Sequence, residues 1–292
     1  MSRTRPGGAD SKLAETVETV TGQRLVGARP LAGGCIAEVL KVELADGGTL
    51  VAKVAEPAGG GLALEARMLR YLADQSELPV PAVRHADDGL LLLDYIESGG
   101  GLDGNAERHA AELLAALHGL TAPAFGFDWD TLIGPLPQPN PWTEDWRVFF
   151  RNRRLMYMGR LALEAGRLPP ATFAGLERLC GKLETYIEPG GRPSLIHGDV
   201  WGGNVLARGG RIAGFVDPAI YFADPEIELA FSTLFGTFGD AFFDRYREIR
   251  PNAPGFFELR RDLYNLYPLL VHTRLFGGSY AASVERILAR LL

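Results

Sequence analysis

Three polar side chains in the C-terminal half of the chain most constrain what it can fold into. Asp199 lies in a polar turn after the apolar pair Leu195 and Ile196, Asn204 follows five residues later, and Asp217 ends a further apolar run. A carboxylate at the first position can accept a proton from an attacking hydroxyl, whereas a carboxamide and a second carboxylate supply hard oxygen ligands for Mg²⁺. An acidic surface turn would leave Asn204 and Asp217 as coincidences. The fold is therefore expected to bring this loop and the end of a strand together at one site.

The same spacing points to a reaction class. His197-Gly-Asp199, then Asn204, then a strand that ends in Asp217, fits the pattern with which kinases bind ATP and Mg²⁺ and transfer a phosphoryl group. ATP and Mg²⁺ are therefore the expected cofactors, with Asp199 as the catalytic base and Asn204 and Asp217 as the metal ligands. His197 is expected to be a buried histidine that braces the loop. The other four histidines lack partners at metal-ligand spacing.

The composition is that of an ordinary globular protein, and it argues against several classes of function. The chain has 292 residues, enough for a sizeable core and two lobes. Its net charge of −6 argues against a nucleic-acid partner, although a local basic pocket for phosphates stays possible. No apolar run approaches the roughly 20 residues of a membrane span, and the N-terminus lacks the apolar stretch of a signal peptide. With only two cysteines, Cys35 and Cys180, a cytoplasmic protein without membrane contact is expected.

The first third of the chain is rich in predicted strands. A helix capped by Asp10 or Ser11 is expected to end near Gly22, and a helix is expected over 62–73. Apolar runs predict a hairpin of strands 39–44 and 50–54 around the turn 45–48, and a buried strand over 90–96. The glycine-rich segment 98–101 then loosens the backbone. Residues 1–97 are therefore expected to form an N-terminal lobe and residues 98–292 a C-terminal lobe.

The remainder of the chain is mostly helical in pattern. Helices are expected over residues 105–120, 143–166, 169–187, 224–248 and 256–290, and residues 125–142, rich in Pro, Gly and aromatics, predict an irregular loop. A strand-rich part followed by a helical part predicts the α+β class, with a bilobal protein-kinase-like fold.

Candidate nucleotide-binding residues lie in the strand-rich part. Gly33, Gly34 and Cys35 come before the first hairpin strand, where glycines would let backbone amides approach a phosphate chain, although a plain turn explains them equally well. Lys53 ends the run Leu50-Val-Ala-Lys53, and a lysine in an apolar strand either points to water at an edge or is paired. We expect it to hold the ATP phosphates and to pair with Glu65 of the next helix.

The adenine is expected to bind where the buried strand 90–96 leaves the sheet. Leu91-Leu-Leu-Asp94-Tyr95-Ile96 resembles a kinase hinge, in which backbone groups hold the base. The carbonyl of Asp94 and the amide of Ile96 are the candidates, and a simple core strand followed by a loop is compatible with the same residues.

The motifs together resemble one family over essentially the whole chain, from about residue 10 to 290. That family is the fructosamine kinase (ketosamine-3-kinase) family, on the small-molecule branch of the protein-kinase-like superfamily. The segments that carry the resemblance are Gly33-Gly-Cys-Ile36, Phe125-Gly-Phe127, Ile133-Gly134, Pro137-Gln-Pro-Asn140, Trp142, Asp145-Trp146, His197-Gly-Asp-Val-Trp201-Gly-Gly-Asn204 and Asp217-Pro-Ala-Ile-Tyr221. Trp201 and the Gln-Pro-Asn block are the most specific of them.

The resemblance implies ATP-dependent phosphorylation of the 3-hydroxyl of a ketosamine, which is a sugar joined to an amine by an Amadori linkage. The phosphorylated product decomposes and frees the amine, which is deglycation. Trp201 would then flank the sugar, since an indole can stack on a sugar face, although a core tryptophan that packs the loop is the alternative. Another small-molecule kinase, of the aminoglycoside or choline kinase type, is the competing interpretation, and a non-catalytic nucleotide-binding module is a third.

Some features of the sequence have more than one interpretation. The family usually carries acidic residues near Asp224 and Glu228, but Glu228 stands where Asp is expected, and Asp224 is expected to cap the next helix or to brace the catalytic loop. Cys35 is either an inert small residue or a redox switch, because a thiol beside backbone amides and a lysine is prone to oxidation. The protein would accordingly be a monomer or a redox-dependent homodimer through Cys35. Ribulosamine, erythrulosamine and fructosamine, with a free amino acid or a protein lysine as the amine, are equally compatible with the sequence.

Overall fold

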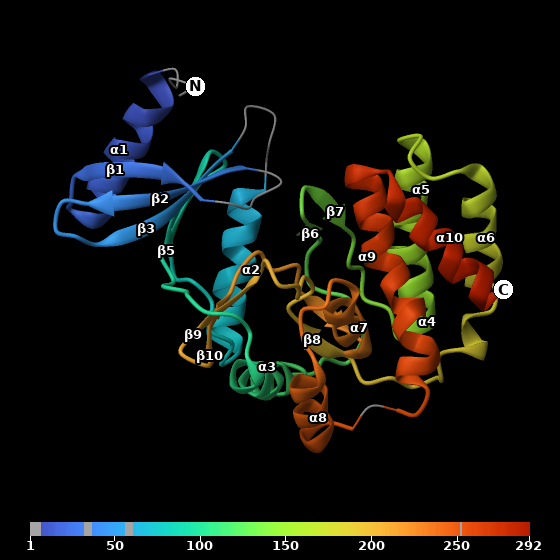
Figure 1. Cartoon of the computed structure of the whole chain (residues 1–292). Coiled ribbons are helices and arrows are strands. Elements are labelled where there is room, and N and C mark those ends of the chain that lie inside the picture. The colour runs from blue at the N-terminus through green and yellow to red at the C-terminus, as the bar shows by residue number, and fades with distance from the viewer. Residues whose placement is uncertain (1–6, 32–36, 56–60, 252) are drawn as a thin grey trace.

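The structure is a computed structural model that describes residues 7–31, 37–55, 61–251 and 253–292 (Figure 1). Its N-terminal part is an antiparallel five-stranded sheet with the strand order β1-β2-β3-β5-β4. The strands are β1 Leu25–Pro30, β2 Ala37–Leu44, β3 Thr49–Ala55, β4 Val83–Ala86 and β5 Leu90–Asp94.

Two helices cover the two faces of this sheet. Side chains alternate along a strand, so the even-numbered residues of β2, β3 and β5 pack on α1, Gly7–Thr21, through Leu13 and Val17. The odd-numbered Leu91 and Leu93 pack on the other side, against α2, Leu62–Gln75. Lys53 is paired in register with Leu91 and Val39, and the same alternation places it on the α2 face.

The predicted hairpin and the two predicted helices of this part are confirmed, with shifted ends. The turn between β2 and β3 forms because Asp46 Oδ1 accepts a hydrogen bond of 2.8 Å from the Gly48 amide while Gly47 takes a positive φ of 87°. The first helix begins at Gly7, earlier than its predicted cap, and the strand predicted over 90–96 ends at Asp94. Strands β1 and β4 were not predicted. Most of β1 is exposed and β4 has only four residues, so neither carries a clear apolar pattern.

The C-terminal part is a bundle of helices with three short two-stranded sheets at its sheet-facing side (Figure 1). They pair β6 with β7 and β9 with β10 as hairpins, and β8 with β11 across the intervening β9–β10 hairpin. The helices are α3 Gly104–Leu117, α4 Trp146–Phe149, α5 Met156–Glu164, α6 Pro170–Cys180, α7 Glu226–Leu234, α8 Asp240–Ile249, α9 Arg261–Phe276 and α10 Ser279–Leu291, and the strands are β6 Thr131–Ile133, β7 Leu136–Gln138, β8 Ser194–Ile196, β9 Val205–Arg208, β10 Arg211–Phe215 and β11 Tyr221–Ala223.

Several predicted helices are divided in the structure. The helix predicted over 224–248 ends at Leu234 and resumes as α8, with Gly236 at a φ of 64° between the two. The helix predicted over 256–290 is broken by Gly277 and Gly278, both at positive φ, into α9 and α10. The helix predicted over 143–166 contains a π-helical segment, Phe150–Leu155, between α4 and α5. The predicted irregular loop 125–142 contains the β6–β7 hairpin.

The two parts are joined by more than the connecting chain. The amide of Gly99, just past the predicted boundary, donates to the carbonyl of Ala207 in β9 at 3.0 Å and so fixes the connecting segment, and the amide of Phe215 in β10 donates to the carbonyl of Pro79 in the N-terminal part at 2.8 Å. The tip of α2 also contacts the C-terminal part, where the ring of Tyr71 packs edge-on against Phe127 with centroids 4.9 Å apart. The lobes therefore have a fixed relation at several points.

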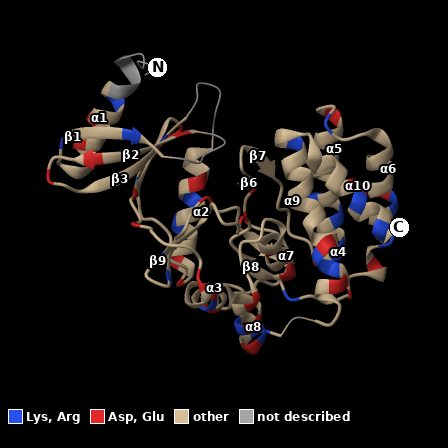
Figure 2. Cartoon of the chain, in the orientation of Figure 1, with Lys and Arg blue, Asp and Glu red and all other residues tan. Residues whose placement is uncertain are grey.

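Charged residues of both signs are interspersed along the elements of both parts (Figure 2). Across the described ranges, none of the helices combines the length and the hydropathy that crossing a membrane requires.

Candidate active site

The loop that carries Asp199 connects β8 to β9. Gly198 has a φ of 87°, and a Cβ at this position would lie 2.1 Å from the carbonyl oxygen of Ala219, so only glycine fits. The same Ala219 donates its amide to the carbonyl of His197 at 2.7 Å. The loop is thus pressed against the segment that follows Asp217, which explains the glycine of the motif.

Asn204 fixes the carboxylate of Asp199. Its Nδ2 donates to the backbone carbonyl of Asp199 at 2.9 Å and to Oδ2 of the same residue at 2.8 Å. Burial of the carboxyl group, together with repulsion from Asp217, raises the pKa of Asp199 to about 8. A cation close to Asp199 would oppose both effects and favour the carboxylate form.

Asp217 reaches the site from the end of β10. The amide of Val216 donates to the carbonyl of Asn204 at 3.0 Å, which ties the strand end to the loop. Asp217 is the non-glycine residue with a positive φ, 55°, within the described ranges. Such backbone strain is found where the surrounding structure holds a functional side chain in place.

Lys53 joins the two parts of the molecule. Its Nζ donates to Glu65 Oε1 at 2.6 Å and to Asp217 Oδ1, although Lys53 is only 8% exposed. Burial works against the ammonium, but the charges and hydrogen bonds of Glu65 and Asp217 outweigh it and raise the pKa of Lys53. The predicted pairing of Lys53 with Glu65 is confirmed, and the structure adds Asp217 to the pair.

A buried acid to which the sequence pattern assigned no role, Glu228, holds the loop of Asp199. Glu228 in α7 accepts hydrogen bonds from the amides of Gly198 at 2.6 Å and of His197 at 3.3 Å. Its Oε2 also accepts from His118 Nε2 at 2.9 Å, and Nδ1 of His118 lies 2.7 Å from the hydroxyl of Tyr246. Burial opposes ionisation, yet the hydrogen bond and charge of His118 lower the pKa of Glu228 below its usual range. The signal available in the sequence was the pair of acids Glu226 and Glu228 in a helix that carries no other charge.

Two further predictions near the loop are confirmed. Asp224 Oδ1 accepts from the amide of Glu226 at 2.9 Å at the start of α7, and Oδ2 accepts from the hydroxyl of Tyr264 at 2.8 Å. Asp224 therefore acts as a helix-start acceptor. His197 is fully buried, as expected, and its Nδ1 accepts from the amide of Asp199 at 3.3 Å.

The Gln-Pro-Asn block is a buried framework. Gln138 Nε2 donates to the carbonyl of Ala219 at 3.0 Å, and Tyr267 donates to Gln138 Oε1 at 2.7 Å. Asn140 Oδ1 accepts from the buried Arg154 at 2.6 Å. The block therefore supports the chain just after Asp217.

The candidate adenine-binding residues lie at the junction of the two parts. Asp94 ends β5, and its carboxylate forms a bidentate ion pair with the exposed Arg84. The group of Asp94 predicted to bind adenine is its backbone carbonyl. The side chain of Ile96 packs on β10, where a Cβ at Gly214 would lie 2.4 Å from Ile96 Cδ1. The predicted phosphate-loop residues Gly33, Gly34 and Cys35 lie outside the described residues.

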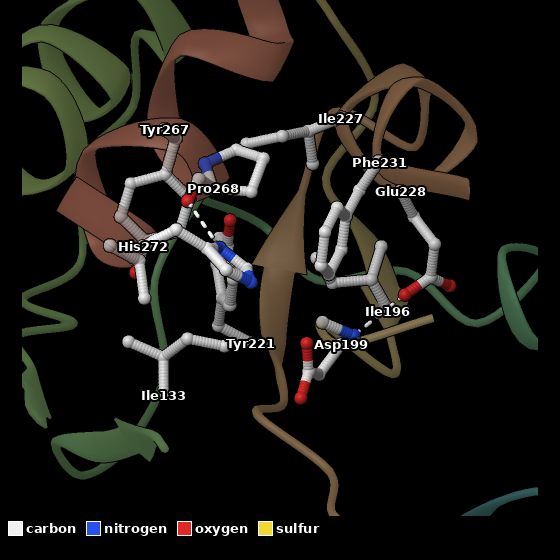
Figure 3. A pocket seen from close by; sticks show the side chains of 12 residues that line it. Ile133, Ile196, Asp199, Tyr221, Ile227, Glu228, Phe231, Tyr267, Pro268 and His272 are labelled. Carbon is white, nitrogen blue, oxygen red and sulfur yellow. Dashed lines mark hydrogen bonds between the residues drawn. The ribbon is translucent and has the colours of Figure 1, made fainter. Parts of the chain in front are cut away.

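Beside Asp199 the surface is hollowed into a mainly apolar pocket (Figure 3). Tyr267, Pro268 and His272 of α9 form one wall, and Ile227 and Phe231 of α7 lie opposite, as Figure 3 shows. Trp201 is 40% exposed, and its ring contacts that of Phe235 with centroids 6.2 Å apart. Among the described residues no cluster of three or more His, Cys, Asp or Glu side chains could bind a metal by itself.

In this site a lysine on one face of a sheet is paired with a helix glutamate, and it lies opposite a loop with Asp and Asn and a further Asp at a strand end. This arrangement defines the class of protein-kinase-like phosphotransferases. More specifically, the chain belongs to the fructosamine kinase family, whose model matches residues 9–292. It is accordingly an ATP-dependent phosphotransferase, as its sequence predicted.

Named relatives agree with this assignment. A "probable ketoamine kinase" of Synechocystis is 35% identical in an alignment of 292 positions that covers 96% of each chain. A chloroplastic protein-ribulosamine 3-kinase of Arabidopsis thaliana is 30% identical and covers 88% of this chain and 79% of its own length. A candidate fructosamine-3-kinase of Thermobifida fusca, known from a crystal structure, superposes with a TM-score of 0.82 at 30% identity over 95% of this chain and 98% of its own. An aminoglycoside phosphotransferase, at 17% identity and a TM-score of 0.66 over 95% of this chain and 98% of its own, shares the fold alone.

Proposed function

We propose that this protein transfers the γ-phosphoryl group of ATP to the 3-hydroxyl of a ketosamine. The observation that carries the proposal is the contact of Lys53 with both Glu65 and Asp217, because a lysine that could bind the phosphates then lies next to the loop of Asp199. The membership of the fructosamine kinase family supports the acceptor, since its named relatives act on ketoamines or ribulosamines.

In this proposal Asp199 is the base. It accepts the proton of the 3-hydroxyl as that oxygen forms a bond to the γ-phosphorus, and the bond from the γ-phosphorus to the bridging oxygen of ADP breaks. Asn204 and Glu228 hold the loop so that the carboxylate keeps one direction. Most of the acceleration then comes from positioning and from charge placed in advance.

We propose Asn204 and Asp217 as the protein ligands of Mg²⁺. Both present side-chain oxygens, and two protein ligands suit an ion that keeps water and phosphate oxygens as its other ligands. The ion supplies positive charge that offsets the phosphates and favours the ionised form of Asp199. Lys53 and Glu65 would position the α- and β-phosphates, and the backbone of Asp94 and Ile96 would hold the adenine.

The proposed assembly divides the chain at residues 97 and 98. The lobe of residues 1–97 would bind the phosphates, with Gly33, Gly34 and Cys35 over them, and the lobe of residues 98–292 would bind metal and sugar. Trp201 would flank the sugar, in keeping with its exposed ring. The proposed product carries its phosphate β to the amine-bearing carbon, so it decomposes and releases the amine.

The test is a panel of acceptors with ATP and Mg²⁺: a ribulosamine, a fructosamine, choline and kanamycin, with ADP release as the signal. The proposal expects turnover of a ketosamine, a 3-phosphate by ³¹P NMR, and turnover at least 100-fold lower for Asp199→Asn. Turnover of choline or kanamycin alone would establish the alternative small-molecule kinase instead.

A further inference from the structure

Aromatic rings continue from the pocket beside Asp199 to the surface over α7 and α9. We call this set the aromatic face. Phe231 and His272 line the pocket, and Trp201, Phe235 and Phe276 are 40%, 42% and 54% exposed. The members of the aromatic face are Trp201, Phe231, Phe235, His272, Phe276 and Tyr280.

The rings form one contiguous surface. The centroid of Phe235 lies 5.1 Å from that of His272 and 6.2 Å from that of Trp201. From His272 the contacts continue to Phe276 at 5.7 Å and to Tyr280 at 5.0 Å. Single exposed apolar side chains are common, but a contiguous exposed patch marks a binding surface. Its continuity with the pocket of Asp199 connects it to catalysis.

The geometry of a ketosamine indicates which part of the substrate would contact the aromatic face. In a ketosamine the amine nitrogen is three bonds from the carbon that carries the 3-hydroxyl, which is roughly 4 Å. With the hydroxyl at Asp199, the substituent on the amine therefore leaves the sugar close to the rings of Phe231 and His272. We propose that the aromatic face binds this substituent, and that the enzyme prefers ketosamines whose amine carries an apolar or aromatic group.

His272 supplies a polar contact within the aromatic face. Its Nδ1 donates to the carbonyl of Pro268 at 2.8 Å, as the dashed line in Figure 3 shows, so Nε2 has the free electron pair. No described residue forms a hydrogen bond with Nε2. It can accept a hydrogen bond from the N–H of the substrate amine, while the faces of the neighbouring rings attract a positively charged amine. Burial lowers the pKa of His272, which keeps the ring an acceptor at neutral pH.

The inference rests on the proposed function, and the experiment separates the two. The substrates are a matched pair, phenylalanine and glycine, each joined to the sugar that the acceptor panel identifies. The wild-type kcat/KM for the phenylalanine derivative is expected to exceed that for the glycine derivative by about 10-fold or more, mainly through KM. In Phe235→Ala this ratio is expected to fall toward 1. Phe276→Ala, at a more exposed position, is a second variant that keeps the test available if Phe235→Ala does not fold.

Ile249→Ala is the matched control, because Ile249 is 43% exposed at the end of α8 and lies outside the aromatic face. This variant is expected to keep the wild-type ratio. Equal use of both substrates by the wild type, or an unchanged ratio in Phe235→Ala and Phe276→Ala, would overturn the inference while leaving ketosamine phosphorylation intact. A ratio that changes only together with a dimer-to-monomer shift in light scattering would assign the face to self-association and also overturn it. Absence of turnover with any ketosamine would instead refute the proposed function.

Discussion

The carboxylate of Glu228 accepts a 2.6 Å hydrogen bond from the amide of Gly198, thirty residues earlier in the chain and next to Asp199. The other oxygen of the same carboxylate accepts from His118 Nε2. A buried acid in α7 thus fixes the backbone of the loop without touching the reacting atoms. The buried carboxylate of Glu228 needs both the loop amides and His118 as hydrogen-bond partners, because an unpaired buried charge destabilises the folded protein.

Shortening this acid tests its positioning role. Glu228→Asp withdraws the carboxylate by roughly 1.5 Å, one carbon–carbon bond, and lengthens its contacts with the loop amides. We expect kcat to fall about 10-fold or more with little change in the KM for ATP, and the free energy of unfolding to fall by about 1–3 kcal/mol. Steady-state kinetics and urea denaturation measure the two effects.

The matched control is Glu226→Asp in the same helix. Glu226 is also buried and forms an ion pair with Arg260 at 2.6 Å, away from the catalytic loop. The Glu226→Asp variant is expected to have a lower free energy of unfolding but an unchanged kcat. Equal loss of kcat in both variants would mean that the effect of Glu228 is general destabilisation and not loop positioning.

Replacing Asp199, the proposed base, should separate activity from stability. Because burial and Asp217 raise the pKa of Asp199 to about 8, its ionised form is a cost to the folded protein at neutral pH. Asp199→Asn is therefore expected to lower kcat by at least about 100-fold while raising the free energy of unfolding by ~1 kcal/mol. Denaturation in metal-free buffer measures the second effect, and a clear loss of stability would contradict this description of the site.

A cation–π contact ties α2 to the other part of the chain. Arg67 lies in α2, two residues after Glu65. Its guanidinium carbon is 3.6 Å from the centroid of the Trp129 ring. A double-mutant cycle of Arg67→Ala and Trp129→Ala is expected to give a coupling energy of about 0.5–2 kcal/mol. Since α2 carries Glu65, both single variants should also raise the KM for ATP. Additive effects on stability would show that the two side chains do not interact.

The buried His197 predicts a pH dependence of stability. Burial lowers its pKa in the folded protein, whereas the unfolded chain has a histidine pKa near 6.5. Above that value both states are neutral. Below it the unfolded state binds a proton that the folded state does not, so stability falls as pH falls. Between pH 7 and 5.5 the wild type should therefore lose more stability than His197→Asn, and an equal loss in the two proteins by urea denaturation at both pH values would refute this.

The part of the site that is local in sequence could be predicted. Asp199 and Asn204 lie on one loop, Asp217 follows the next hairpin, and their spacing predicted one common site. The pairing of Lys53 with Glu65 also followed, because a lysine inside an apolar strand needs a partner and the next helix offers one acid in its first turn.

The remaining features depend on tertiary packing that no single segment encodes. Glu228 acquires its role from His118, which is 110 residues away in sequence. The division of the long predicted helices depends on the positive φ of Gly236, Gly277 and Gly278, and glycine within a helical pattern does not by itself end a helix. Strand β1 joins the sheet through backbone hydrogen bonds with β2. Its side chains are mostly exposed, so they give little sign of a strand in the sequence.

The hydrogen bond from Phe215 in β10 to Pro79 has a consequence for how this protein can be recombined with its relatives. Strand β10 belongs by connectivity to the C-terminal part, yet it is bonded to the segment that precedes β4 and is packed against Ile96. A chimaera that exchanges only residues 1–97 would separate these partners. Exchanges that move residues 205–217 together with the sheet would keep the interface of one parent whole.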